Sequence, residues 1–589
     1  MKKNDWILLL SVATYSFLFY EQTAGINFLL FTIVLIAGLL IRNKEILTNR
    51  SWQLIALGSL LSGVCVACYG NALSVIANII SLSILSGISL RTKPTVILSL
   101  LFSIYSYITA PVFIFLDRIE KKKTSDTVPN KLYRHIGLIA IPVAITLIFF
   151  FIYRASNPLF AELSDKINFD FISWDWVFFT LGGFLLLYGF FYHKKIKEIF
   201  LLDENAANNL SVTTTETTII FGKEISISEE NFSGIILFSL LNILLLIVNS
   251  LDINFLFIDG KLPPNITYAQ FVHEGIGAII ISVITAIAII LFYFRGSVNF
   301  YKKNKAIKVL AYCWIVQNAF MLIATISKNN LYVSQYGLTY KRIGVYIYLL
   351  LTIIGLITTF IKILQVKTNN FLFRINGWLF YSVLIISSFI SWDRCITFYN
   401  INRSKYLEKS YLLNLSDSNL PQLFEMKNTA AAKARVIVSN DETDSLQTET
   451  DFGNALNKKL YTYLQTYDSI GWRSWYYDDT RIYNRLTKAA VFNKINDLDL
   501  SNTTDYDTTT LLHFTSLTNL KLSNCNITTI GFLKNNTKLE YLDLTGNTIN
   551  DFSALYGLKQ LKELYVSDIT RTNYQLLVSN LPKTKINFQ

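Results

Sequence analysis

The sequence predicts an all-α polytopic membrane bundle, followed by a helical connector and a short α/β repeat solenoid. Apolar runs long enough to cross a bilayer recur from residue 6 to residue 392. Charged residues make up only 16% of the chain, whereas globular proteins carry about 25%. Aliphatic residues then recur with a fixed 22-residue period over the last part of the chain. We therefore expect domains at 1–392, 393–490 and 491–589.

The first domain is predicted to be helical because its apolar runs are long. A helix needs about 20 apolar residues to cross the hydrocarbon core, and barrel strands would alternate apolar and polar residues instead. The predicted segments are 6–20, 24–41, 52–69, 71–90, 95–116, 135–153, 174–192, 233–250, 269–294, 309–327, 343–364 and 376–392.

The formal net charge of +12 belongs almost entirely to the membrane domain. Residues 1–392 carry 31 Lys and Arg against 20 Asp and Glu, and residues 393–589 carry 22 against 21. Basic residues gather in loops on the cytoplasmic side of a membrane, so this charge indicates topology and we expect no nucleic-acid partner.

Positive charge alternates between successive loops after residue 116. Four loops hold 17 Lys and Arg, and the three loops between them hold 6. The first set is 117–134, 193–232, 295–308 and 365–375. We expect this set to be cytoplasmic and the C-terminal domains to be extracytoplasmic.

The first five segments leave the number of crossings at eleven or twelve. If all five cross, the basic loops 42–50 and 91–93 lie outside; if one does not cross, both lie inside. The candidate for not crossing is 95–116, where Pro94 and Pro111 could allow a re-entrant path.

Polar residues within these segments are the first place to look for an intramembrane site. Amides at Asn71, Asn78, Asn242 and Asn249 join His273, Glu274, Gln317 and Asn318. Amides commonly join neighbouring helices, and we expect this role for most of them. The alternative is a path through Glu274, His273, Gln317 and Asn318 in a transporter or flippase.

The sequence contains none of the usual catalytic groupings. It lacks an H-E-x-x-H pair, a P-loop and a G-x-S-x-G elbow. An intramembrane enzyme would have only Asp252, Asp259 and Glu274 as acidic candidates, and solvated loops explain these equally well. We therefore expect no enzymatic activity, catalytic residue, cofactor or metal.

Several short motifs occur in an order that resembles a known family. The motifs are Asn157–Phe160, Gln317–Asn318, Tyr336–Thr339 with Arg342, Trp392–Asp393, Tyr399–Arg403, Leu415–Asp417, Leu420–Pro421 and Gly471–Trp475 with Arg481 and Arg485. The chain resembles bacterial multi-pass membrane proteins that share a domain of unknown function, over roughly residues 130–490. The resemblance implies a protein of the bacterial inner membrane with a helical segment outside it. The sequence departs from the family pattern at Ser418–Asn419, where an acidic residue and alanine are more usual.

The connector, residues 393–490, is predicted to be mainly helical. Helical apolar spacing occurs at 406–413, 420–426 and 452–467, and the acidic stretch 439–450 is typical of a solvated loop. An aromatic and basic cluster spans Trp472–Arg481. We expect it to pack at the bilayer interface, with binding of an anionic headgroup or glycan as the alternative.

The last domain carries five aliphatic pairs, each 22 residues after the one before. The pairs are Leu498/Leu500, Leu520/Leu522, Leu542/Leu544, Leu564/Val566 and Ile586/Phe588. Residues 517–527 and 539–549 fit the pattern L-x-x-L-x-L-x-x-N/C-x-L, which identifies a leucine-rich-repeat solenoid with a repeat similar to the internalin type. Each repeat should supply one short strand, with Cys525 or Asn547 bonding the turn from inside.

Alternation along these strands predicts which side chains face outward. Asp499, Lys521, Asp543 and Tyr565 should lie on the concave face, which is where repeat proteins commonly bind partners. We therefore expect an envelope-anchored binding or scaffolding protein, held in the lipid bilayer, that contacts an extracytoplasmic protein or cell-envelope polymer. A solvated face without a partner remains the alternative.

Overall fold

The computed structural model describes most of the chain and divides it into two compact units. It describes residues 3–89, 95–123, 142, 145–146, 149–150, 152–160, 173–194, 196–211, 217–220, 223–259, 268–427, 449–503, 507–567 and 569–588. The first unit comprises Met1–Thr23, Asn27–Gly63 and Ile76–Asn205, and the second comprises Ala24–Ile26, Val64–Val75 and Ala206–Gln589.

The first unit is a helical bundle with a polar interior. Its elements are α1 (Lys3–Phe19), α2 (Ile26–Arg42), η1 (Lys44–Thr48), α3 (Arg50–Tyr69), α4 (Ala72–Ile88), α5 (Val96–Lys123), α8 (Trp174–Phe191) and α9 (Lys197–Glu204). Buried Asn78 of α4 donates to the Thr32 hydroxyl at 3.0 Å and to the Ser59 carbonyl at 3.0 Å. One amide thus ties three helices together, which is the role expected for such residues.

The second unit begins with a short hairpin and five long helices. These elements are β1 (Thr217–Ile220), β2 (Lys223–Ser226), α10 (Ile227–Ile253), η2 (Asn254–Asp259), α11 (Tyr268–Tyr293), η3 (Ser297–Phe300), α12 (Lys305–Tyr336), α13 (Tyr340–Leu364) and α14 (Asn369–Ser388). A capping box at Ser226 and Glu229 starts α10, and the hydroxyls of Thr339 and Thr368 cap α13 and α14.

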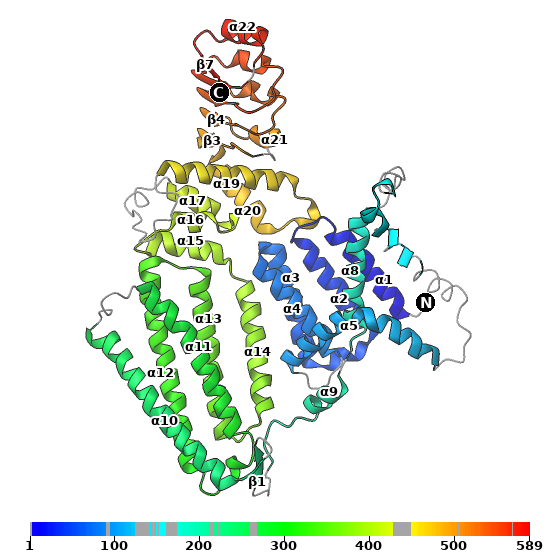
Figure 1. The fold of residues 1–589 in the computed structure, drawn as a ribbon, viewed down its shortest axis with the longest axis vertical. Helices are drawn as coiled ribbons and strands as arrows, with labels where there is room; N and C mark the ends of the chain where they lie inside the picture. Colours follow the sequence, from blue (N-terminus) through cyan, green and yellow to red (C-terminus); the bar gives the residue numbers. More distant parts are fainter. Residues whose placement is uncertain are drawn as a thin grey trace. The chain divides into compact units, whose positions relative to one another are not determined.

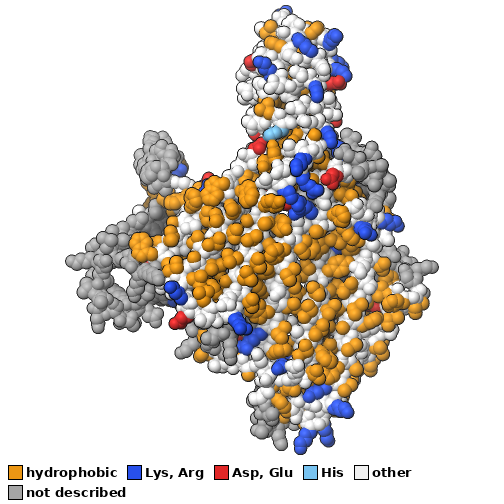
Figure 2. Space-filling model, turned by 180° about the vertical axis from the view of Figure 1, so that it is seen from behind, with side chains coloured by type: hydrophobic (Ala, Val, Ile, Leu, Met, Phe, Trp, Pro, Cys, Tyr) orange, Lys and Arg blue, Asp and Glu red, His pale blue; other side chains and the backbone are white. Residues whose placement is uncertain are grey.

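Among the described residues, seven helices are long and apolar enough to cross a membrane. They lie at Arg50–Tyr69, Val96–Ile114, Trp174–Phe191, Ile227–Ile258, Lys305–Tyr336, Tyr340–Leu364 and Asn369–Ser388, and four shorter apolar helices accompany them. Apolar side chains cover the outer faces of the helices that Figure 2 shows. On α10 the side chains of Leu240, Leu244, Leu246 and Ile247 are 57–62% exposed, as expected where lipid replaces water.

Eleven of the twelve predicted segments coincide with helices, and 135–153 lies largely outside the described residues. Helix α5 continues through Pro111 as a single helix, so the re-entrant path suggested for 95–116 is not observed. The last segment, predicted at 376–392, starts at Asn369 and ends at Ser388 because Thr368 caps it, and Trp392 begins a separate helix.

The connector is helical, as predicted, and contains two helices that the apolar spacing missed. Its elements are α15 (Trp392–Arg403), α16 (Lys409–Leu413), η4 (Asp417–Asn419), α17 (Leu420–Lys427), α19 (Glu449–Ser469), η5 (Trp472–Ser474), α20 (Tyr477–Lys488) and η6 (Phe492–Lys494). Helices α15 and α20 are rich in polar residues, so their periodicity is weak. The predicted solvated loop 439–450 falls almost entirely outside the described residues.

The repeat domain is a solenoid of five parallel strands in the order β3-β4-β5-β6-β7 (Figure 1). The strands are β3 (Asp497–Asp499), β4 (Asn519–Lys521), β5 (Tyr541–Asp543), β6 (Glu563–Val566) and β7 (Lys585–Phe588). Short helical turns connect them: α21 (Thr508–Leu511), η7 (Gly531–Asn535), η8 (Ser553–Gly557) and α22 (Arg571–Asn580). The register pairs Leu498, Leu520, Leu542, Leu564 and Ile586 in succession. This confirms the 22-residue repeat.

Polar turn residues hold each repeat from inside, also as predicted. The Asn547 side-chain oxygen accepts from the amides of Cys525 and Ile527, both at 3.0 Å, and its nitrogen donates to the Leu522 carbonyl at 2.7 Å. The buried Cys525 thiol donates to the Leu500 carbonyl at 3.2 Å. These bonds satisfy backbone groups that would otherwise be buried without partners.

A single hydrophobic core joins the connector to the solenoid. Leu456, Leu460 and Leu464 of α19 belong to the same buried cluster as Leu498 and Leu520. Helix α19 packs against β3 and closes the open end of the stack (Figure 1). It therefore serves as the terminal cap that a repeat array requires.

Candidate binding face of the repeat solenoid

Two columns of outward side chains run across the parallel sheet. The register places Asp499, Lys521, Asp543 and Tyr565 in one column, so the four residues predicted for the concave face are direct neighbours from strand to strand. A second column lies two residues earlier on each strand and consists of Asp497, Asn519, Tyr541, Glu563 and Lys585. The first column was predicted; the same alternation, extended by two residues, would have found the second.

The first strands of this face border a pocket of about 380 Å³. The residues that line it are Asn454, Asp497, Leu498, Asp499, Asn519, Lys521 and Tyr541. Asn454 comes from α19, so the connector supplies one wall of the pocket. No sequence pattern near the repeats indicates this contribution, because it depends on how α19 caps the stack.

Only some of the polar side chains on this face bond to one another. Lys521 Nζ lies 3.9 Å from the Asp499 carboxylate, and the Tyr565 hydroxyl donates to Glu563 at 3.0 Å. The rings of Tyr541 and Tyr565 have centroids 5.3 Å apart at an angle of 39°. The bond to Glu563 raises the pKa of Tyr565, so its hydroxyl remains a donor at neutral pH. The face therefore offers two tyrosine rings flanked by carboxylates and by the ammonium groups of Lys521 and Lys585.

The candidate intramembrane residues divide into two groups. Gln317 of α12 donates to the Asn242 side chain of α10 at 2.8 Å, and Asn242 donates to the Leu310 carbonyl at 3.0 Å. Asn249 donates to the Gln317 carbonyl at 3.1 Å, whereas Asn318 bonds the Trp314 carbonyl within its own helix at 2.8 Å. The amides of α10 and α12 thus join these two helices. The side chains of His273 and Glu274 lie outside the described residues.

The family motifs converge in the connector, although they are far apart in the chain. Buried Asp393 accepts a bond from the Tyr340 hydroxyl at 2.7 Å and one from the Ser416 amide at 3.2 Å. Asn400 of α15 accepts from the Leu338 amide and donates to the Leu338 carbonyl at 2.9 Å. These pairs attach the turn between α12 and α13 to the first connector helix.

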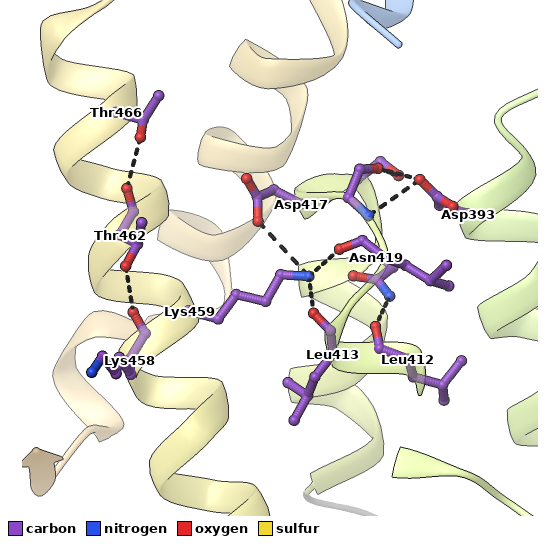
Figure 3. Close-up of polar contacts among 12 residues, drawn as sticks. Asp393, Leu412, Leu413, Asp417, Asn419, Lys458, Lys459, Thr462 and Thr466 are labelled. Carbon is purple, nitrogen blue, oxygen red and sulfur yellow. Dashed lines mark hydrogen bonds and ion pairs between the residues drawn. The ribbon is translucent and has the colours of Figure 1, made fainter. Parts of the chain in front are cut away.

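Lys459 of α19 joins that helix to the segment between α16 and η4 (Figure 3). Its ammonium group donates to the carbonyls of Leu413 at 2.8 Å and Leu415 at 2.5 Å, and lies 3.9 Å from the Asp417 carboxylate. Buried Asn419 donates to the Leu412 carbonyl at 2.8 Å and to the Thr397 hydroxyl at 3.0 Å. Burial lowers the pKa of Lys459, and the nearby carboxylates of Asp417 and Asp393 oppose that shift. These bonds indicate a structural role for the cluster, because they hold the helices of the connector together.

The described residues contain no group of three or more His, Cys, Asp and Glu side chains that could hold a metal ion. The aromatic residues Trp472, Trp475 and Tyr477 are 38–60% exposed, in keeping with contact at an interface.

These features define a multi-pass membrane protein that carries a leucine-rich-repeat domain. Residues 7–426 match the family described as "Domain of unknown function (DUF4153)", and the chain belongs to this family. Residues 515–557 match the model described as "Leucine Rich repeats (2 copies)". Comparison with curated proteins and with solved structures finds no match.

Proposed function

We propose that this protein is a membrane-anchored binding protein whose repeat domain holds a partner on its concave face. The observation that carries the proposal is the pair of in-register columns beside a pocket of about 380 Å³. The side chains there are only partly engaged with each other, and tyrosine is enriched among residues that dominate binding energy. The partner is an extracytoplasmic protein or a cell-envelope polymer.

The location of the repeat follows from the loop charges. We propose that the residues after Trp392 lie outside the cytoplasm, in the envelope of a bacterial cell; the alternation of basic loops in the membrane domain supports this side. The shared core of α19 and β3 supports a scaffolding role, because it fixes the concave face to the connector. We propose binding and not catalysis as the activity of this face.

Transport through the membrane helices is the less supported alternative. Of its candidates, Gln317 donates to the Asn242 side chain of α10 and Asn318 bonds the Trp314 carbonyl. The side chains of the other two, His273 and Glu274, lie outside the described residues. The bonds of Gln317 and Asn318 favour a structural role for both amides.

Site-specific photo-cross-linking in living cells tests the binding face. A photoreactive residue at Lys521 should give a discrete adduct, and one at exposed Lys538, which lies outside both columns, should not. Replacing Tyr565 by Ala should weaken capture at least tenfold, because it removes an aromatic anchor. Tyr574→Ala, which changes an exposed tyrosine of α22, is the matched control. Equal adducts at both positions, or unchanged capture by the Tyr565 variant, would contradict the proposal.

A further inference from the structure

A polar pocket lies in the first unit, far from the repeat domain along the sequence. Its volume is about 240 Å³, and the helices α2, α4 and α8 all end beside it. Its polar lining consists of Arg42, Asn43, Ser86, Ser89, His193 and Lys194, together with Tyr192. Three basic side chains from two segments 150 residues apart thus surround one hollow at the ends of apolar helices.

Arg42 is positioned by α8 and still presents donors to the pocket. One nitrogen of its guanidinium donates to the Phe191 carbonyl, and the group lies 4.5 Å from the centroid of the Tyr192 ring. A guanidinium has five N–H groups, so this bond occupies only one of them. The Tyr192 hydroxyl donates to Asp5 at 3.0 Å, which places one carboxylate near the ring. The basic groups around the pocket still outnumber it.

The hydrogen bonds around His193 favour the protonated, cationic ring. Its Nδ1 lies 3.1 Å from the Ser86 hydroxyl, and its Nε2 lies 3.5 Å from the Ser103 hydroxyl. Each serine already donates its proton to a backbone carbonyl: Ser86 to Phe190 at 2.6 Å and Ser103 to Ser83 at 2.5 Å. Both hydroxyls therefore present lone pairs to the ring, and only an imidazolium donates from both nitrogens.

We propose that this pocket binds a phosphate group. Arginine forms paired hydrogen bonds with phosphate oxygens, and the adjacent imidazolium and ammonium groups add charge. Basic pockets between membrane helices bind the head groups of anionic lipids. The shared chemistry is a phosphate mono- or diester, and its source is either a lipid head group or a soluble phosphate. The competing explanation is that the three cations only neutralise the carboxyl ends of helices.

Calorimetric titration of the full chain in nanodiscs of neutral phosphatidylcholine separates these possibilities. The probes are dioctanoyl phosphatidic acid, inorganic phosphate, and dioctanoylglycerol as the matched lipid without phosphate. Arg42→Gln should weaken binding at least tenfold, because a hydrogen-bonded charge is lost. Lys194→Gln should weaken it several-fold. Lys44→Gln removes the same charge from an exposed residue that does not line the pocket, and it should bind as the unaltered chain does.

Each outcome has one meaning. Saturable binding of both phosphate probes, or of phosphatidic acid alone, supports the pocket and identifies the soluble or the lipid source. Equal affinity for dioctanoylglycerol, no saturable binding, or equal effects of the Lys194 and Lys44 variants overturns the proposal. If Arg42→Gln loses helical circular dichroism, the comparison of the Lys194 and Lys44 variants decides the test.

Discussion

Burial raises the pKa of two neighbouring carboxyl groups in the connector, Asp478 and Asp479, but the two differ in their ion pairs. Asp478 lies 3.3 Å from the Arg394 guanidinium and 3.2 Å from that of Arg481. Asp479, which is 4% exposed, forms no ion pair with any residue that the structure describes, and its backbone carbonyl accepts from the Tyr463 hydroxyl at 3.0 Å. Burial, reinforced by repulsion from Asp417 and Asp478, raises the pKa of Asp479 to about 6, although a bond from Tyr463 opposes the shift. Ionisation of Asp479 therefore lowers the free energy of unfolding of the protein.

Replacing Asp479 by Asn should stabilise the protein at neutral pH. The pKa of Asp479 is higher in the folded chain than its ordinary value of 3.8, so the folded state binds the extra proton between about pH 4 and pH 6. Stability falls as pH rises through that window, and the full penalty is present above it. We expect Asp479→Asn to gain about 1–2 kcal/mol at pH 7.5 and nothing at pH 4.

Thermal unfolding of the detergent-solubilised chain at both pH values measures this difference. Asp478→Asn is the control: burial raises the pKa of Asp478 as well, but the guanidinium groups of Arg394 and Arg485 oppose that shift, so this substitution also breaks an ion pair and should gain less than Asp479→Asn. A lower melting temperature for the Asp479 variant at pH 7.5 would contradict the assignment.

At the scale of elements, amide side chains fix how α10 packs on α12. Asn242 accepts from Gln317 and donates to the Leu310 carbonyl, and Asn249 adds a third bond about two turns further along α10. Lipid offers no competing hydrogen bonds, so such pairs hold register between helices whose other contacts are apolar.

Removing one member of this pair should cost more than removing both. Asn242→Leu leaves the buried Gln317 amide without its acceptor, and we expect a loss of about 1–2 kcal/mol. The double variant with Gln317→Leu should recover part of that loss, because no unpaired amide remains. A double-mutant cycle from reversible unfolding in mild detergent and dodecyl sulfate measures the coupling. Additive effects would show that the two side chains do not interact.

At the scale of the molecule, the first unit bears on how many times the chain crosses the membrane. Helices α2, α4 and α8 all end beside the pocket of Arg42 and His193, so the residues that follow them emerge on one membrane face. The eleven-crossing alternative places loops 42–50, 91–93 and 193–232 together on the cytoplasmic side. It requires that one segment between α4 and α8 does not cross, and the unbroken α5 shows no re-entrant path that would account for this. The twelve-crossing alternative places loops 42–50 and 91–93 on the opposite side from loop 193–232. It therefore disagrees with three helix ends that lie beside one pocket.

Single cysteines in a chain without its five native ones test this topology in intact cells. Lys44→Cys and Glu198→Cys should both resist a membrane-impermeant maleimide until the membrane is opened. Lys562→Cys in the repeat should react at once if that domain lies outside, as we propose from the loop charges. Opposite labelling of Lys44→Cys and Glu198→Cys would restore twelve crossings, and protection of Lys562→Cys would remove the extracytoplasmic assignment.

The sequence predicts repetitive features well and long-range ones poorly. Leucines 498, 520 and 542 recur at a fixed spacing, so they predict their own strands and the column of Asp499, Lys521 and Asp543. Asn454 and His193 cannot be predicted in this way. Each lines a pocket because elements distant in the sequence pack beside it, and no local sequence pattern indicates that packing. The role of Asn419 also depends on long-range packing, because its amide donates to the hydroxyl of Thr397 as well as to the carbonyl of Leu412.

The shared core of connector and solenoid has a mechanical consequence. Ile343 of α13, Ile396 of α15, Leu460 of α19 and the strand leucines all belong to one buried cluster. A force that pulls the concave face away from the last membrane helices would therefore have to expose that cluster to water, which costs free energy. Tension from a captured polymer would reach the bilayer through α13 and its neighbours. Under the proposed function, this core would transmit tension on a bound partner to the membrane helices as well as hold the concave face in place.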